Sequence, residues 1–214
     1  GAISSAFFLY GIAFTYGVTH STRLSAISQY LSAQSMAGEP MVLIALGLLL
    51  VGFAFKISAV PFHMWTPDAY QGAPTLVTGF MSTAVKAAAF AAFARVFLTA
   101  LEPFRSQWLP MLTVVTGLTM ILGTVVGVAQ SNVKRMLAYS SIAHAGYLLA
   151  AFAGFGSTGI AAASFYTTAY AAMNVGIFAV VTLISGYEEQ RPLIQDFRGV
   201  IYRSPLLGGL LIFF

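Results

Sequence analysis

Apolar runs long enough to cross a lipid bilayer recur along the chain. The runs at 40–65 and 76–100 both exceed the roughly 18 residues that mark a transmembrane helix. Of the 214 residues, 58% are hydrophobic and 7% are charged, whereas soluble domains carry about 25% charged residues. The runs also lack the two-residue alternation of membrane β-barrels. The sequence therefore predicts an all-α fold, a polytopic transmembrane helical bundle.

Polar connections divide the chain into seven hydrophobic segments of a single membrane domain spanning 1–214. Both ends of the sequence fall inside apolar runs, so we expect an internal fragment whose first and last segments are incomplete. Most connections are short, which predicts antiparallel packing of neighbouring helices. The longest polar connection, 19–39, is expected to hold a short surface helix at 23–32. The predicted segments lie near 2–18, 40–65, 76–100, 109–129, 132–155, 159–185 and 205–214.

The composition argues against several functional classes. The net charge of +4 comes from ten Lys and Arg residues spread over many loops, which does not indicate nucleic-acid binding. The absence of cysteine excludes disulfides and thiolate metal sites. Three histidines far apart in the sequence argue against a metal site, and no phosphate-binding or redox-cofactor motif is present. We therefore expect no cofactor and no metal in this chain.

Basic residues predict the orientation in the membrane, because cytoplasmic loops carry an excess of Lys and Arg. The loops after residues 65, 129 and 185 share one face of the bundle. The opposite face holds Arg23 and Arg105, with Arg95 near a helix end. The first face is therefore expected to be cytoplasmic. Separately, we expect the membrane to be a bacterial inner membrane. Its basic residues are Lys134, Arg135, Arg191, Arg198 and Arg203.

Two lysines lie inside the hydrophobic runs. Lys56 and Lys86 occupy consecutive segments, and a lysine at the bilayer centre costs at least about 2.5 kcal/mol. Counting 1.5 Å per residue places Lys56 roughly 14 Å deep and Lys86 roughly 15 Å deep. Two ammonium groups at one level repel each other, which favours proton release. The alternative is that each side chain extends to the membrane surface, which Lys56 would do more readily than Lys86.

Lys56 is followed by a predicted helix break. Pro61 lacks an N–H, and its ring clashes with the carbonyl four residues earlier, that of Ile57. Ser58 is also adjacent. Apolar residues resume after the proline, so a discontinuous helix is expected near 56–61. Broken helices at this depth are typical of transporters, where irregular backbone lines a cavity.

Two histidines are candidate proton relays. His144 is expected roughly 18 Å into a helix that begins near Asn132, and imidazole titrates near neutral pH. A packed, hydrogen-bonded histidine is an equally good interpretation. His63 follows the break and would gate access from the cytoplasmic side, or it would be an interfacial histidine beside Trp65. His20 lies in a loop and receives no role.

Other polar residues receive structural roles. Lys134 and Arg135 are interpreted as topology signals, and Asp68 as a helix cap or the partner of a base. Hydroxyl and amide groups in two segments could hold water chains, but they also hold membrane helices together, which is the favoured interpretation. These groups belong to Tyr139, Ser140, Ser141, Thr167, Thr168, Tyr170 and Asn174.

Two long motifs resemble one family. KISAVPFHMWTPDAYQGAPTLVTGFMSTAVKAAAF at 56–90 and SNVKRMLAYSSIAHAGYLL at 131–149 are similar to the antiporter-like membrane subunits of respiratory complex I. Related subunits occur in multisubunit Na+/H+ antiporters and membrane-bound hydrogenases. Within complex I, the first motif is most similar to the N subunits of NADH-quinone oxidoreductase. The resemblance covers most of the chain.

The resemblance implies an inverted-repeat fold of two five-helix units, each with a discontinuous helix. This chain would run from the sixth helix into the twelfth. Lys56 matches the lysine of the first broken helix, Lys86 the central lysine of the next helix, and His144 a histidine after the SNVKR motif. The family's glutamate on the fifth helix and lysine on the second broken helix would lie beyond the ends.

The implied activity is proton translocation coupled to quinone reduction in other subunits of an H+-translocating NADH:quinone oxidoreductase. The expected partners are other membrane subunits of complex I and membrane lipid, with protons as the transported species. Two alternatives stay open from the residues alone. One is a cation/proton antiporter, hydrogenase subunit or stand-alone secondary transporter. The other is a scaffold whose lysines only pair with acidic helices.

Overall fold

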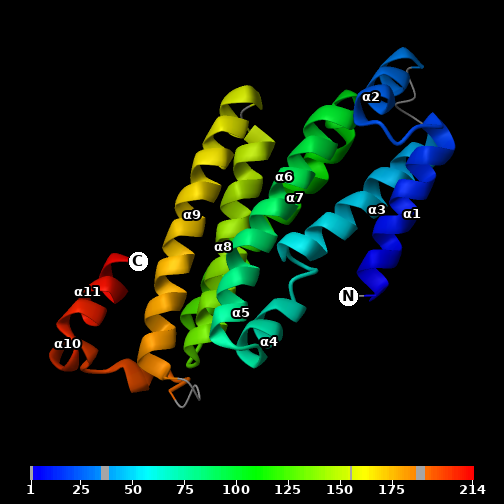
Figure 1. The fold of residues 1–214 in the computed structure, drawn as a ribbon. Coiled ribbons are helices and arrows are strands. Elements are labelled where there is room, and N and C mark those ends of the chain that lie inside the picture. The colour runs from blue at the N-terminus through cyan, green and yellow to red at the C-terminus, as the bar shows by residue number, and fades with distance from the viewer. Residues whose placement is uncertain (1, 35–38, 155, 187–190) are drawn as a thin grey trace.

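The computed structural model describes residues 2–34, 39–154, 156–186 and 191–214. Helices dominate these residues, and they form a bundle of long, roughly parallel and antiparallel rods (Figure 1). In chain order the elements are α1 (Ala2–Thr19), α2 (Leu24–Ala33), α3 (Pro40–Ile57), α4 (Trp65–Gly72), α5 (Thr75–Phe80), η1 (Met81–Val85), α6 (Lys86–Arg95), η2 (Val96–Ala100), η3 (Glu102–Phe104), α7 (Arg105–Val128), α8 (Val133–Gly154), α9 (Gly156–Ser185), η4 (Ile194–Phe197), α10 (Val200–Arg203) and α11 (Pro205–Phe213).

The chain is a multi-pass integral membrane protein. Five helical stretches are long and apolar enough to span a bilayer, which confirms the predicted transmembrane helical bundle. They are Pro40–Ile57, Thr75–Ala100, Glu102–Val128, Val133–Gly154 and Thr158–Ser185.

The single domain and its seven segments stay a prediction. Helices α1 and α11 cover the two predicted segments that are not among the five spans. Helix α2 confirms a short helix at the predicted 23–32 position, with Ile27 and Leu31 buried, and its place at the membrane surface stays a prediction. Residues 35–38 of the predicted 19–39 connection and residue 155 at the end of segment 132–155 lie outside the described residues, as do residues 187–190.

The predicted discontinuous helix is confirmed, but its geometry differs from the expectation. Helix α3 begins with Pro40 at its first turn, where a missing N–H costs nothing. It ends at Ile57 because Ser58 adopts a left-handed conformation with φ 65°, a backbone geometry that cannot continue the helix. Helical structure resumes only at Trp65. The helix thus ends three residues before the cis Val60–Pro61 bond, not at the proline clash.

An aromatic cluster forms the core between α3, α6, η2 and α7. The rings of Phe93 and Phe97 stack with centroids 4.6 Å apart, and Phe53 meets both edge-on. Trp108 is fully buried, packs edge-on against Phe97, and donates its Nε1–H to the Leu101 carbonyl at 2.9 Å. This packing holds α6 in a fixed position between α3 and α7.

Helices α7 and α8 approach each other through glycine. A Cβ at Gly123 would lie 2.6 Å from the Ala143 backbone nitrogen, and one at Gly146 would lie 3.0 Å from the Met120 nitrogen. Small residues at such crossings let membrane helices pack closely. The glycines therefore fix the position of α8, which carries several of the candidate site residues.

The turn after α4, the start of α8 and the end of α9 meet at one end of the bundle (Figure 1). Arg135 pairs with Asp68 at 2.6 Å, so Asp68 has the expected basic partner. Lys134 is buried and donates to the Ala73 carbonyl at 2.9 Å, so it is more than the topology signal we expected. The Val133 N–H donates to the Pro192 carbonyl at 2.9 Å, which ties the 191–193 segment to this end.

Candidate functional site

Lys86 lies in the interior of the bundle. Its side chain is only 4% exposed. The Nζ donates to the Ser141 hydroxyl at 2.5 Å and to the Ser141 carbonyl at 2.9 Å. Among the described residues, no carboxylate pairs with Lys86. The ammonium group is therefore held by two neutral oxygens of α8, an arrangement that solvates a charge without trapping it in an ion pair.

A π turn directly precedes Lys86. Residues Met81–Val85 form η1 within the Thr75–Ala100 span, and single π turns in α-helices occur frequently at functional sites. The carbonyl of Gly79 accepts hydrogen bonds from the hydroxyls of Ser82, at 2.9 Å, and Thr83, at 2.8 Å. These side chains satisfy a carbonyl next to the irregular turn, where regular bonding is disturbed.

His144 lies one helical turn beyond Ser141 on α8, inside a group of tyrosines. Its Nδ1 shares a 2.5 Å hydrogen bond with the Tyr166 hydroxyl of α9. The ring centroid of Tyr170 lies 4.9 Å from that of His144, and Tyr147 packs edge-on at 5.6 Å. We call Lys86, Ser141, His144, Tyr166 and Tyr170 the Lys86 cluster.

Two tyrosine hydroxyls around this cluster are buried. Within the described residues, neither the Tyr70 nor the Tyr170 hydroxyl has a hydrogen-bond partner of normal geometry. Both lie near the Ser141 side chain.

Lys56 has a different environment. It occupies the last turn of α3, where the helix C-terminus favours a positive charge. Its side chain is exposed and lines a groove of about 480 Å³ between α1, α3 and α6. Among the described residues, it makes no hydrogen bond or ion pair. We call this region the Lys56 groove; its other lining residues are Ser4, Ser5, Phe8, Leu9, Gly52, Phe53, Val85, Ala89 and Ala92.

The helix break beside Lys56 is held by buried hydrogen bonds. Thr66 donates its hydroxyl to Ser58 at 2.6 Å, which connects the start of α4 to the end of α3. The Val60 N–H donates to the Thr119 hydroxyl of α7 at 2.9 Å. The carbonyl of Phe55 accepts from the Trp65 indole at 3.0 Å. The irregular backbone is therefore fixed within protein, as non-helical backbone in a membrane must be.

His63 lies in this break. It is 5% exposed, its ring centroid is 6.4 Å from that of Tyr139, and its Nδ1 has no hydrogen-bond partner among the described residues. Trp65 instead stacks on Phe55 at 5.3 Å. This burial fits a histidine inside the bundle better than one at the membrane interface.

The four predicted site residues thus fall into three places. Lys86 and His144 share one cluster, because Ser141 and His144 lie on adjacent turns of α8. Lys56 lies in its own groove, which Val85 and Ala89 line from the helix that carries Lys86. Lys86 leaves that helix toward α8. His63 lies in the break beside Tyr139.

The sequence interpretation missed Tyr166 and Tyr70, and for Ser141 and Tyr170 it favoured a packing role over a role in holding water chains. The spacing of Tyr166 and Tyr170 carried a usable signal, since residues four apart share one face of a helix. Nothing in the sequence indicated that this face meets His144. Within the described ranges, no group of His, Asp and Glu could hold a metal ion.

Comparison with known proteins identifies the family of this chain. The model of the family described as NADH:quinone oxidoreductase/Mrp antiporter, TM, matches residues 1–214. The chain belongs to this family. It is 46% identical over 214 residues to NADH-quinone oxidoreductase subunit N 1 of Solibacter usitatus, covering 100% of this chain and 44% of that relative. The chain therefore spans less than half the length of the curated relatives it matches.

Solved structures of the NADH:quinone oxidoreductase/Mrp antiporter family share the fold. A chain of respiratory complex I from Thermus thermophilus, solved with bound aureothin, is 42% identical with a TM-score of 0.75, over 97% of this chain and 43% of that one. A chain of the Mrp complex from Dietzia is 25% identical with a TM-score of 0.87, over 99% and 38%. The fold is thus that of the antiporter-like membrane subunits.

Proposed function

We propose that this chain is part of a proton-translocating membrane subunit of NADH:quinone oxidoreductase. Protons would move through its buried lysines, coupled to quinone reduction elsewhere in the complex. The family membership and the 46% identity to subunit N 1 support this assignment. The observation that carries it is Lys86, a lysine inside a membrane span that contacts neutral oxygens only.

The Lys86 cluster supplies the groups that proton transfer needs. Lys86 would hold the proton and pass it to the Ser141 hydroxyl as that hydroxyl releases its own proton, or to a water bound at that hydroxyl. The Tyr170 ring packs against His144, whose ring carries one site for receiving a proton and one for releasing it. Tyr166 would then fix the His144 tautomer through its hydrogen bond to Nδ1.

Lys56 and His63 would act at the entrance to this path. Lys56 ends α3 beside the break, where backbone irregularity lines space for ions in transporters. It would exchange charge with a carboxylate outside the described residues. His63, buried against Tyr139, would control passage past the break.

The proposed partners are other membrane subunits of complex I and bilayer lipid, with no cofactor in this chain. The proposed location is a bacterial inner membrane. The loops after residues 65, 129 and 185 would be cytoplasmic, because the end of the bundle that they share carries Lys134, Arg135 and Arg191.

The second candidate is a subunit of a multisubunit cation/proton antiporter. It is favoured by the TM-score of 0.87 to the Mrp complex chain, but the sequence identity there is only 25%. Purification of the full-length protein separates the two assignments. Copurification with quinone-reducing subunits supports complex I, whereas cation-dependent proton exchange without them supports the antiporter.

The central test replaces Lys86 by Ala in the full-length protein within its complex. We expect NADH-driven proton pumping in membrane vesicles to fall at least about tenfold, which corresponds to roughly 1.4 kcal/mol in the barrier. Arg95→Ala is the matched control, because Arg95 is an exposed cation on the same helix. Normal pumping by an intact Lys86→Ala complex would exclude the proposed role.

A further inference from the structure

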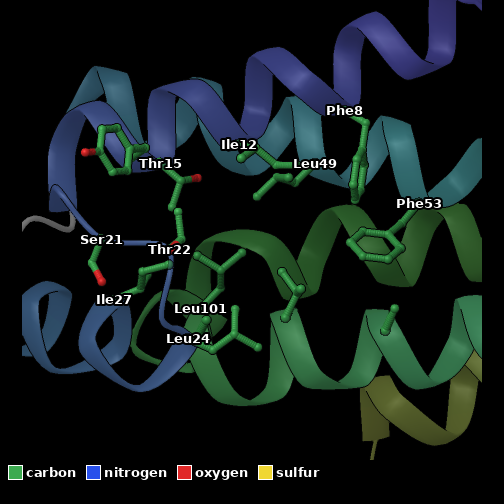
Figure 2. A pocket seen from close by; sticks show the side chains of 14 residues that line it. Phe8, Ile12, Thr15, Ser21, Thr22, Leu24, Ile27, Leu49, Phe53 and Leu101 are labelled. Carbon is green, nitrogen blue, oxygen red and sulfur yellow. The ribbon is translucent and has the colours of Figure 1, made fainter.

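A pocket that adjoins the Lys56 groove has an almost wholly apolar surface. It lies between α1, α2, α3 and η2, and Figure 2 shows Phe8 and Phe53 in its lining. Both residues also line the Lys56 groove, so the pocket continues that groove. The hydroxyl of Thr15 in this lining already donates to a backbone carbonyl at 2.8 Å. Polar side chains that connect the helix break with Lys86 lie instead where α4 meets α8.

Helix α4 is the second half of the discontinuous helix, and it is fastened along α8. Lys134 donates to the carbonyl of Ala73, the residue that caps α4, at 2.9 Å. Further along both helices, Tyr70 of α4 lies in one buried cluster with Ala138 of α8 and Phe178 of α9. These contacts direct the Tyr70 side chain into the space between α8 and α9.

The Tyr70 hydroxyl reaches the polar groups around Lys86. Tyr70 is 1% exposed, and its hydroxyl lies near the Ser141 side chain and Tyr170. Residues three apart share one face of a helix, so a ring that packs at Ala138 lies one turn from Ser141. Among the described residues this hydroxyl has no hydrogen-bond partner. Such burial is costly, which makes the position unfavourable unless another state of the site supplies the bond.

The hydrogen-bonding capacity of Ser141 provides that state. A serine hydroxyl has one donor and two acceptor positions. While Lys86 is protonated, its Nζ occupies one acceptor position at 2.5 Å. Once Lys86 has given up a proton, the neutral amine accepts from the Ser141 O–H, and both acceptor positions of Ser141 become free. Two unpaired hydroxyls lie beside them, those of Tyr70 and Tyr170.

We propose that Tyr70 is a positioning residue of the Lys86 cluster and acts through Ser141. Its hydroxyl donates to Ser141 Oγ when Lys86 is neutral, which keeps the Ser141 O–H directed at Nζ. Because α4 follows the helix break, a movement of α4 displaces this hydroxyl and so connects the break with Lys86. The inference rests on the proposed proton transfer through Lys86, and it adds a residue from the discontinuous helix to that site.

A double-mutant cycle tests this role in the full-length protein within its complex. Tyr70→Phe removes the hydroxyl and keeps the buried ring. We expect it to lower NADH-driven proton pumping in membrane vesicles about threefold. In a Ser141→Ala background the same substitution should cause no further loss, because the group through which Tyr70 acts is already absent. Two independent effects would multiply instead.

Tyr30→Phe is the matched control, because Tyr30 is a half-buried tyrosine of α2 that packs against the hydrophobic core. It should leave pumping unchanged. Removal of an unpaired hydroxyl should also leave assembly intact, which native gels check. A Tyr70→Phe complex that fails to assemble, pumps like Tyr30→Phe, or loses activity multiplicatively with Ser141→Ala would overturn the role of Tyr70. Lys86→Ala, measured in parallel, separates the two ideas, since normal pumping in that variant would remove the proposed function itself.

Discussion

The Lys86 cluster and the Lys56 groove present the same side chain in opposite surroundings. Lys86 is enclosed, and its ammonium group is hydrogen-bonded to a hydroxyl and a carbonyl of α8. Lys56 is exposed in a mostly apolar groove and has no polar partner among the described residues. A lysine in hydrocarbon is costly without such solvation. The first site therefore has its polar partners within these helices, whereas we expect the second to receive a partner from elsewhere.

Replacement of Lys56 tests this contrast most strongly. We expect Lys56→Ala to reduce NADH-driven proton pumping about as much as Lys86→Ala, at least about tenfold, and to lower quinone reductase activity because the two are coupled. Both rates are measured in membrane vesicles. Arg95→Ala again controls for loss of a cation. If pumping stays normal in an assembled complex, the groove has no part in transport.

Removal of the Ser141 hydroxyl is expected to have the next largest effect. A hydrogen bond to a charged group contributes about 1.5–3 kcal/mol, but the Ser141 carbonyl would still accept from Lys86. We therefore expect Ser141→Ala to slow pumping about threefold to tenfold. Ser140→Ala is the matched control, since Ser140 does not contact Lys86. Equal rates in the two variants would mean that the hydroxyl does not take part.

Tyr166→Phe should have a smaller effect. It removes the hydrogen bond to His144 Nδ1 but leaves the ring, and Tyr170 and Tyr147 still pack against the imidazole. We expect pumping to fall about twofold, consistent with the roughly 0.6 kcal/mol of bonds between membrane helices. Tyr202→Phe, at a 90% exposed position, is the control. A loss as large as that of Lys86→Ala would make Tyr166 a central group.

The smallest effect is expected at the end of the bundle, where charges are paired near water. Asp68 is 72% exposed and pairs with Arg135, and exposed ion pairs contribute about 0–1 kcal/mol. Asp68→Asn should leave pumping unchanged and shift thermal unfolding of the purified complex by at most a few degrees. If Asp68→Asn clearly reduced pumping, transport would depend on surface charges as well as on buried ones.

Much of the architecture could be predicted from the sequence. Runs of apolar residues define the spans, and Lys86 lies within one of them. The start of the helix break was not predictable from Pro61, because it depends on the left-handed conformation of Ser58. The hydroxyl of Ser58 accepts a hydrogen bond from Thr66, a residue beyond the break.

The site was less predictable than the spans. Depth along a helix follows from counting residues, but the direction of a side chain depends on which helix packs beside it. Equal depth therefore did not reveal that Lys86 meets α8 while Lys56 faces a groove. The contact between His144 and Tyr166 likewise depends on how α8 and α9 pack, which the sequence of either helix does not contain.

The π turn at Met81–Val85 determines where Lys86 points. An α-helix advances about 100° around its axis with each residue, and a π turn absorbs one extra residue without that advance. Regular helical winding through these five residues would rotate Lys86 by about 100°, away from Ser141. The alignment of the cluster thus depends on the winding phase of one helix. Deleting one residue within the turn would restore regular α-helical winding and keep Lys86 facing Ser141. Adding one residue would rotate Lys86 by about 100°.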